Sequence, residues 1–295
     1  MTVRIPFAFV DVFAREPLTG NPLALVPDAD TLDDATMRAI AREFNQSETT
    51  FLVAPGRAGT TVRLRSFTPG GVEVLGAGHN AMGAWIWLAA NGHVGDGDHT
   101  QQIGEDVLPV QVATAPNGQA VVTMRQSAPS FGATVADAEP LAAALGLDAE
   151  DILVDGPAQV VSTGAGHLLV PARDRAVVDR ASVDAGRLVP LLTSVGAEGC
   201  LVFSRDPVDA ADGAVAYARF FNPMVGIAED PATGTAAGPL VAALVARGEV
   251  APGVEAIVEQ GFALGRPSRL RVTVDGDDVR LSGTGLVVAE GTLLL

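Results

Sequence analysis

The chain has 295 residues, 48% of them hydrophobic and 18% charged, and its formal net charge is −16. This length is enough for two compact domains with buried cores, whereas the acidic charge argues against nucleic acid and anionic membrane as partners, because both attract basic surfaces. The sequence has no lysine and one cysteine, Cys200, which excludes a pyridoxal phosphate Schiff base, a Walker A loop, an intramolecular disulfide and catalysis by two opposed thiols.

No apolar run of the sequence approaches the ~20 residues that a membrane helix needs. Arg4 and Asp11 interrupt the first apolar stretch, so this stretch does not resemble a signal peptide and we expect a cytoplasmic protein. Cys200 lies in an apolar run that is typical of a strand, and we expect it in the core.

Apolar and alternating runs predict the elements of the first part of the chain. Residues 5–13 and 23–26 are predicted to be strands on either side of a loop rich in proline and glycine. Thr31, with Asp34 three residues later, resembles a capping box, and the apolar spacing predicts a helix that continues to Phe44. Further strands are predicted over residues 49–53, 62–67, 107–112 and 120–125.

One stretch of the sequence occurs twice. Glu229 to Gly248 repeats the pattern that begins at Glu73, 156 positions earlier: an acidic residue, a glycine loop, and an apolar helix ended by glycine. The motif R-x-F-x-P is repeated at Arg65 and Arg219, and other matching pairs follow in order with offsets that rise from 144 to about 160. Chance matches would scatter, so we infer two homologous halves. Because Glu73 and Glu229 match, we expect them to share a structural task.

The repeat predicts the organisation of the whole chain. Each half contains a helix without a charged residue, over residues 79–90 and 235–246, which we expect to be buried within a sheet and to superpose on its counterpart. Pro239 is expected in the first turn of the second helix, where proline is tolerated. The predicted boundaries are a first half over residues 1–126, a linker over 127–144, and a second half over 145–295, whose last strand is a candidate to return to the first half.

Both uncharged helices begin with glycines and small residues. The start of a helix offers unpaired N–H groups and a partial positive charge, which suit a carboxylate. We therefore expect a small substrate with a carboxylate group to bind the backbone near Gly78 and Gly234, with Asn80 and Thr235 as additional polar groups.

Three side chains that can transfer protons accompany these helix starts. Glu48 lies at a helix-to-strand junction, His79 follows the glycine loop, and Asp230 lies just before the second helix. A carboxylate that faces another acid/base group can abstract a proton from carbon and return it elsewhere, and no cofactor is required. Structural roles stay open: Glu48 as a solvated residue, His79 as a helix cap, and Asp230 as an N-cap before Pro231.

The motifs N-Q-S-E-T-T-F, G-N-P-L-A-L-V, R-S-F-T-P, V-E-V-L-G-A-G-H and E-D-P-A-T-G-T-A resemble those of the PhzF-like phenazine biosynthesis family, within the diaminopimelate epimerase fold. The resemblance spans nearly the whole chain. It implies the α+β class, with two pseudo-symmetric domains that each wrap a central helix in a curved, mostly antiparallel sheet. It also implies an active site between the domains, a homodimer, and an isomerase without a cofactor, whose type member isomerises trans-2,3-dihydro-3-hydroxyanthranilate.

When the family's residue roles are transferred to the matching motifs, the resemblance implies that Glu48 is the acid/base group and that His79 and Asp230 are further catalytic residues. The sequence departs from the family at Ala77, which is often cysteine, at Asn80, which is often alanine, and at Thr235, which replaces a serine. Ala77 removes thiol chemistry at that position. The bulkier Asn80 argues against the type member's substrate.

These observations predict an isomerase or epimerase, without cofactor or metal, that moves a proton on a small carboxylate-bearing metabolite. One alternative is a lyase that uses the same proton abstraction to expel water. The other is a catalytically silent protein that binds a metabolite. His93 and His99 lie in turns rich in glycine and aspartate, and we expect solvated loop residues there rather than metal ligands.

Overall fold

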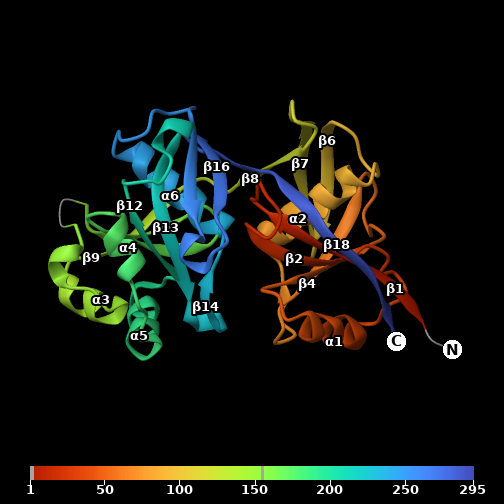
Figure 1. Ribbon diagram of the computed structural model, residues 1–295, viewed down its shortest axis with the longest axis horizontal. Coiled ribbons are helices and arrows are strands. Elements are labelled where there is room, and N and C mark those ends of the chain that lie inside the picture. The colour runs from red at the N-terminus through yellow and green to blue at the C-terminus, as the bar shows by residue number, and fades with distance from the viewer. Residues whose placement is uncertain (1–2, 154–155) are drawn as a thin grey trace. The chain divides into compact units, whose positions relative to one another are not determined.

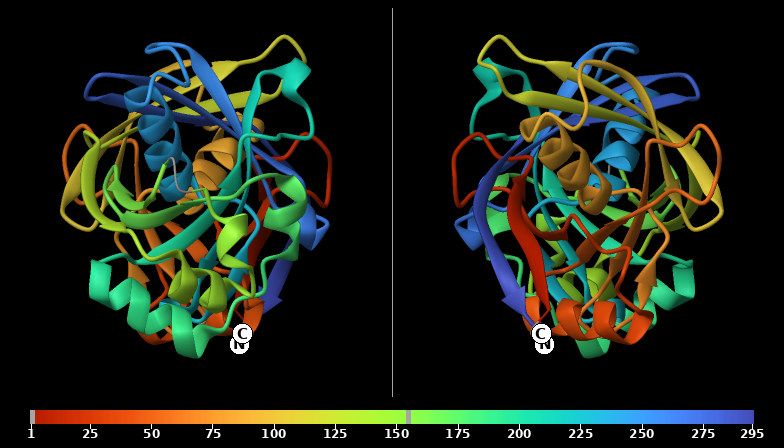
Figure 2. Two further views of the ribbon diagram at one scale, coloured as in Figure 1. Left: turned by 90° about the vertical axis from the view of Figure 1, so that its left-hand side faces the viewer. Right: turned by 90° about the vertical axis from the view of Figure 1, so that its right-hand side faces the viewer.

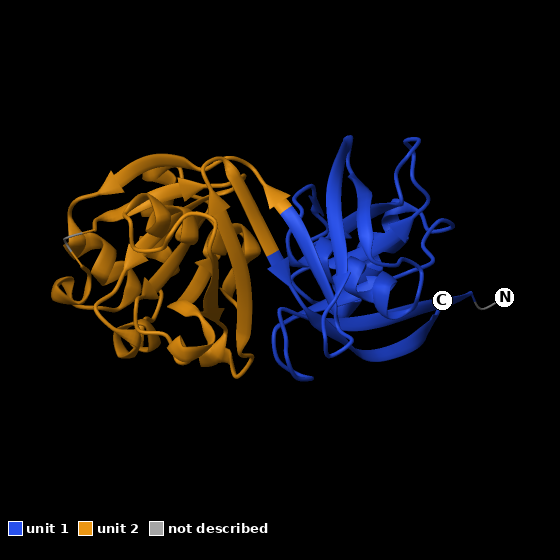
Figure 3. Ribbon diagram, turned by 90° about the horizontal axis from the view of Figure 1, so that it is seen from above, with its two compact units in different colours: residues 1–124, 282–295 blue, residues 125–281 orange. Residues whose placement is uncertain are grey.

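The computed structural model describes residues 3–153 and 156–295. It divides into two compact units: unit 1 comprises Met1–Met124 and Ser282–Leu295, and unit 2 comprises Arg125–Leu281 (Figure 3). Both units combine helices with a mixed sheet, which confirms the predicted α+β class. Among the described helices, none is both long and apolar enough to cross a membrane.

Unit 1 wraps a mostly antiparallel sheet around one buried helix. Its elements are β1 (Arg4–Val12), β2 (Asn21–Val26), α1 (Asp34–Phe44), β3 (Thr49–Val53), β4 (Val62–Phe67), β5 (Glu73–Val74), α2 (His79–Ala90), β6 (Gly97–Ile103), β7 (Asp106–Thr114), β8 (Ala120–Gln126) and β18 (Gly285–Leu294). The strand order is β18-β1-β2-β3-β4-β6-β7-β8, antiparallel except for the parallel pairs β2–β3 and β4–β6. The first and last strands lie side by side, with Arg4 opposite Leu294 (Figure 1).

Unit 2 repeats this plan. Its elements are β9 (Ser130–Val135), α3 (Ala138–Leu145), β10 (Ala158–Ser162), β11 (Gly166–Pro171), α4 (Arg175–Arg180), α5 (Ala185–Val195), β12 (Gly199–Ser204), β13 (Ala214–Asn222), β14 (Ile227–Asp230), α6 (Gly234–Ala246), β15 (Glu255–Gln260), β16 (Ser268–Asp275) and β17 (Asp278–Gly283), with short 3₁₀ turns between some of them. The strand order is β9-β10-β11-β12-β13-β15-β16, antiparallel except for the parallel pairs β11–β12 and β13–β15.

The two parallel pairs occur at matching places in the two units, and in each unit the buried helix precedes the last strand of the second pair. α2 contacts β1, β2, β3 and β18, whereas α6 contacts β10, β11, β15 and β16 (Figure 2). Both helices are buried along most of their length, because neither carries a charged side chain that requires water. The predicted pair of central helices wrapped in sheet is confirmed.

An arginine–glutamate pair is also duplicated. In unit 1, Arg65 Nε lies 2.8 Å from Glu73 Oε1 and its Nη2 lies 2.9 Å from Oε2. In unit 2, the corresponding distances from Arg219 to Glu229 are 2.9 and 2.7 Å. Such two-point pairs are among the strongest hydrogen-bonded ion pairs. Each one fastens the short strand before a central helix to the neighbouring long strand, which is the shared structural task expected of the two glutamates.

Three local predictions are corrected by the structure. The region 127–144 is not a simple linker, because it contains β9, which pairs with β10, and most of α3. Helix α1 is capped by Asp33, whose carboxylate accepts from the Thr36 N–H at 2.8 Å, and not by Thr31. α6 begins at Gly234, so Pro239 lies beyond its first turn.

Candidate active site

Glu48 lies between two elements of unit 1 that hold it firmly. Before it, α1 ends at Asn45, which adopts a left-handed conformation with φ of 51° and donates its N–H to Ala41. After it, β3 begins at once with Thr49 and Thr50, which are both buried. The Glu48 side chain is itself only 16% exposed. The local sequence therefore places a carboxyl group where water has little access.

The Glu48 carboxyl group lies beside the His79 imidazole. Glu48 Oε2 is 3.1 Å from His79 Nε2, and the His79 side chain is 9% exposed. Glu48 Oε2 accepts no hydrogen bond from any described residue with good geometry. Burial raises the pKa of Glu48 from its ordinary value of 4.5 to about 7, because the charged form loses hydration. A carboxylate in this state is a stronger base than one in water.

The loop before α2 is fixed by the side chain of Asn80. Its Oδ1 accepts from the Gly78 N–H at 2.7 Å, and its Nδ2 donates to the Gly76 carbonyl at 3.0 Å and to Ser66 Oγ at 3.1 Å. These contacts hold the loop that carries His79. They also occupy the Gly78 N–H, so an anion at this helix start would have to use the N–H groups that follow it.

Asp230 lies at the end of β14 in unit 2 and is 6% exposed. Its Oδ2 accepts from the Thr233 hydroxyl at 2.5 Å, and its backbone carbonyl accepts from Gln260 Nε2 at 2.7 Å. The N-cap of α6 is Thr233, whose hydroxyl makes no capping hydrogen bond. Asp230 is therefore not the N-cap that its position before proline suggested.

Thr235, in the first turn of α6, contacts a histidine that sequence reasoning missed. His167 Nε2 lies 3.2 Å from Thr235 Oγ1, and the His167 ring packs edge to face on Phe220 with centroids 4.9 Å apart. His167 is 3% exposed, and burial lowers its pKa to about 4, which keeps the imidazole neutral. The only signal for it in the sequence was a histidine inside the apolar strand G-H-L-L-V.

Gln126 is a second residue that the sequence did not single out. Its Nε2 donates to the Gly234 carbonyl at 2.9 Å, and its Oε1 accepts from Thr163 Oγ1 at 2.7 Å. Gln126 thus fixes the backbone at the start of α6, much as Asn80 fixes the loop before α2. Nothing near Gln126 in the sequence points to α6, which is over one hundred residues away.

Each unit therefore gathers its own share of the predicted residues at the start of its central helix. Among the described residues, no cluster of three or more His, Cys, Asp or Glu side chains could hold a metal ion. Cys200 is fully buried, and burial raises the pKa of its thiol to about 12. The residues assembled in unit 1 are Glu48, Gly78, His79 and Asn80, and those in unit 2 are Asp230, Gly234 and Thr235.

The chain matches known proteins over nearly its full length. The family described as "Phenazine biosynthesis-like protein" matches residues 10–291. The trans-2,3-dihydro-3-hydroxyanthranilate isomerase of Pseudomonas aeruginosa is 33% identical over 98% of this chain and 99% of its own. The uncharacterized isomerase YddE of Escherichia coli is also 33% identical, over 95% of each chain.

Solved structures agree with these matches. A PhzF-family phenazine biosynthesis protein from Bacillus anthracis superposes with a TM-score of 0.91 at 29% identity, covering 99% of this chain and 100% of its own. A hydroxyproline epimerase from Agrobacterium vitis shares the fold alone, with a TM-score of 0.65 at 14% identity, over 99% of this chain and 93% of its own. The chain belongs to the phenazine biosynthesis-like family, whose named relatives are isomerases and predicted epimerases.

Proposed function

We propose that this protein is an isomerase or epimerase that needs no cofactor, and that Glu48 moves a proton on a small metabolite with a carboxylate group. One observation supports this proposal above the others: a buried Glu48 with a pKa near 7, 3.1 Å from the His79 imidazole. A general base works best when its pKa lies near the working pH. Near pH 7 the ionised and neutral forms of Glu48 are therefore both accessible, and the ionised form is a stronger base than an exposed carboxylate.

His79 is assigned the task of assisting this proton transfer. Its Nε2 is close enough to Glu48 to exchange a proton with it or to stabilise negative charge that develops on the substrate. Asn80 keeps this arrangement in place by fixing the preceding loop. Preorganisation of this kind matters because a shift of the reacting groups by about 1 Å costs a large part of the rate.

Unit 2 is assigned the binding of the substrate carboxylate. The α6 start has no side-chain cap. The N–H groups of Ala236 and Ala237 donate to the Thr233 carbonyl, which leaves those of Gly234 and Thr235, without an acceptor among the described residues, for an anion. The Thr235 hydroxyl, held by the neutral His167, adds a further donor or acceptor. Asp230 is the other catalytic candidate, and its carboxylate orientation is fixed by Thr233. The Pseudomonas aeruginosa relative is named as an isomerase of a hydroxyanthranilate, which carries a carboxylate group, and this name supports a carboxylate substrate.

The test is hydrogen exchange at carbon. Candidate carboxylates, with trans-2,3-dihydro-3-hydroxyanthranilate first, are incubated with the protein in deuterated water, and deuterium at carbon is followed by NMR and mass spectrometry. We expect one deuterium per turnover without net loss of atoms. Glu48→Gln should slow exchange by about 10²- to 10⁴-fold, as expected for loss of a general base, while ligand affinity changes by less than several-fold.

Other outcomes separate the competing assignments. If Glu48→Gln exchanges as fast as the parent and Asp230→Asn does not, Asp230 is the base. A product that has lost water identifies a lyase. A carboxylate that binds tightly but never exchanges would contradict an enzymatic role for that ligand and support a binding protein.

A further inference from the structure

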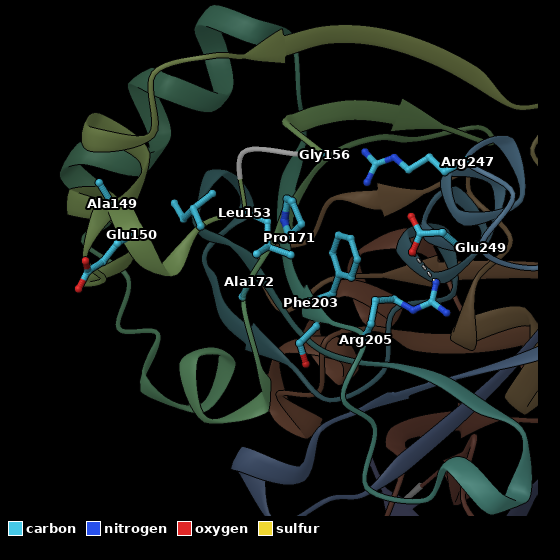
Figure 4. Close-up of a pocket in the computed structure, with 12 residues that line it drawn as sticks. Ala149, Glu150, Leu153, Gly156, Pro171, Ala172, Phe203, Arg205, Arg247 and Glu249 are labelled. Atoms are coloured by element: carbon cyan, nitrogen blue, oxygen red, sulfur yellow. Dashed lines mark hydrogen bonds and ion pairs between the residues drawn. The ribbon is translucent and has the colours of Figure 1, made fainter.

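Unit 2 contains a cavity of about 400 Å³ that is separate from its predicted site residues (Figure 4). Arg247, which follows the last turn of α6, lines it, whereas Thr235 lies in the first turn of the same helix. The two positions are twelve steps apart along the chain, which corresponds to about 18 Å at the rise of an α-helix. A ligand in this cavity would therefore lie far from Thr235.

The walls of this cavity are mainly apolar. Ile152, Pro171 and Phe203 line it, and all three come from segments that also contribute to the core of unit 2. Concave, largely apolar pockets of about 300–1,000 Å³ with a few polar groups are typical of small-molecule sites. The size fits a ligand with one ring or a branched aliphatic group.

Among the described residues, the charges around the cavity leave the Arg247 guanidinium uncompensated. Arg205 and Glu249 neutralise each other, with Nη1 2.9 Å from Oε2. The Arg247 backbone N–H donates to Ala243, but its guanidinium makes no hydrogen bond or ion pair with any residue that the structure describes. Figure 4 shows its guanidinium extending across the cavity toward Gly156, and a β-carbon placed on Gly156 would lie 2.7 Å from Arg247 Nη1. The guanidinium thus lies over an apolar cavity, and no residue that the structure describes supplies an anion to it.

We propose that this cavity binds a small organic monoanion with an apolar body, of the size of an aromatic carboxylate. The carboxylate would pair with Arg247, and the apolar body would contact Phe203 and Pro171. Guanidinium and carboxylate groups match in geometry, which favours this anion over a halide. A polyanion is disfavoured, because Glu150 and Glu249 also line the cavity and the whole chain is acidic.

The test uses 4-fluorobenzoate as probe and follows its binding by ¹⁹F NMR on the full-length protein. We expect 4-fluorobenzamide, which has nearly the same shape without charge, to bind at least about 10-fold more weakly, because it lacks the charged hydrogen bonds. Acetate, which has the charge without the ring, should also bind more weakly. Equal binding of the amide and the acid, or no binding of the acid at millimolar concentrations, would overturn the proposal.

Variants locate the site. Arg247→Gln should weaken binding of 4-fluorobenzoate by about 10-fold or more, and Arg247→Lys should retain part of the affinity. Arg42→Gln is the matched control, because Arg42 also lies at a helix C-terminus, is exposed, and has no partner among the described residues. A second variant tests the cavity without changing Arg247. Leu153 lies at the rim and is 41% exposed, so the larger side chain of Leu153→Trp should fill the cavity and prevent binding of the probe.

A second anion site could mimic this result, so Thr235→Val is included. The proposal predicts that Thr235→Val binds the probe like the parent. Loss of binding in Thr235→Val but not in Arg247→Gln would place the probe at the α6 N-terminus and overturn the proposal. This test measures binding of a probe rather than turnover. Its failure would therefore not contradict the proposed isomerase function, and a failure of the isomerase proposal would not contradict binding in the cavity.

Discussion

The starts of the two central helices differ, although the scaffold around them is duplicated. His79 at the start of α2 lies beside Glu48, whereas Thr235, its counterpart 156 positions later, lies beside His167. Burial shifts the pKa values of Glu48 and His167 in opposite directions. It raises the pKa of the Glu48 carboxyl to about 7 and lowers that of the His167 imidazole to about 4. Both groups are therefore pushed toward their neutral forms.

The Arg–Glu pairs show the other side of this comparison. Arg65–Glu73 and Arg219–Glu229 keep the same residues and nearly the same distances in both units. We interpret the features that both halves retain as parts of the scaffold, and the features that differ as candidates for a task that belongs to one half. On this basis we propose that unit 1 carries the proton-transfer group, and that the neutral imidazole of unit 2 positions a hydroxyl.

The largest expected effect separates these two tasks. Glu48→Gln should reduce turnover by about 10²- to 10⁴-fold, whereas His167→Gln should change kcat by less than several-fold and mainly raise KM. In the parent, kcat/KM should rise with pH and level off above about 7, as Glu48 ionises. Steady-state kinetics of both variants from pH 5 to 9 checks this. An equal loss of kcat in both variants would break the comparison.

The second prediction concerns the stability of the two Arg–Glu pairs. Arg219→Met should reduce the free energy of unfolding by about 3–5 kcal/mol, because it leaves Glu229, whose side chain is only 12% exposed, without its partner. Arg219 also donates to the backbone carbonyls of Val178, Asp179 and Ala181. Arg65→Met should cost less, because the Glu73 side chain is 29% exposed and can regain water. Urea unfolding measures both, and the reverse ranking would contradict this account.

The third prediction is a pair of opposite pH dependences. Since the folded pKa of Glu48 is raised, its contribution to stability is complete below pH 4.5 and is lost as pH rises through 7. Since the folded pKa of His167 is depressed, its contribution is complete above pH 6.5 and is lost as pH falls toward 4. Each full effect is on the order of 3 kcal/mol, from the difference between the folded and unfolded pKa of each group.

Two variants reveal these dependences. Relative to the parent, Glu48→Gln should become more stable as pH rises from 4.5 to 7, and His167→Gln should become more stable as pH falls from 6.5 to 4. Urea unfolding at pH steps of one half measures the difference between each variant and the parent. Stability differences that do not change with pH would show that neither group is held neutral by burial.

The smallest expected effect lies at Thr235. Thr235→Val removes the hydroxyl but keeps the shape, so KM should rise several-fold while kcat changes little. Thr235→Ser keeps the hydroxyl and serves as the control, with kinetics close to those of the parent. A loss of kcat in Thr235→Val without a change in KM would move Thr235 from binding to catalysis.

Local patterns in the sequence determined the pair of central helices, and the resemblance of the motifs to a known family implied the fold class. The absence of charge on residues 79–90 and 235–246 was enough to predict burial, because an ionised side chain would have required water. The repeat predicted two similar halves, because matching elements in matching order fold in the same way. Motifs pointed to Glu48, His79 and Asp230, but gave no distances and no pKa values.

Only the tertiary structure decided which groups meet and how much water they keep. His167 and Thr235 are 68 positions apart, and Gln126 and Gly234 are 108 apart. No local pattern links such residues, because the pairing follows from strand order and helix placement. The pKa of Glu48 could not be predicted from the sequence either, because it depends on how much hydration the surrounding elements remove. β9 was hidden for the same reason: its residues are mostly exposed, and only its pairing with β10 makes it a strand.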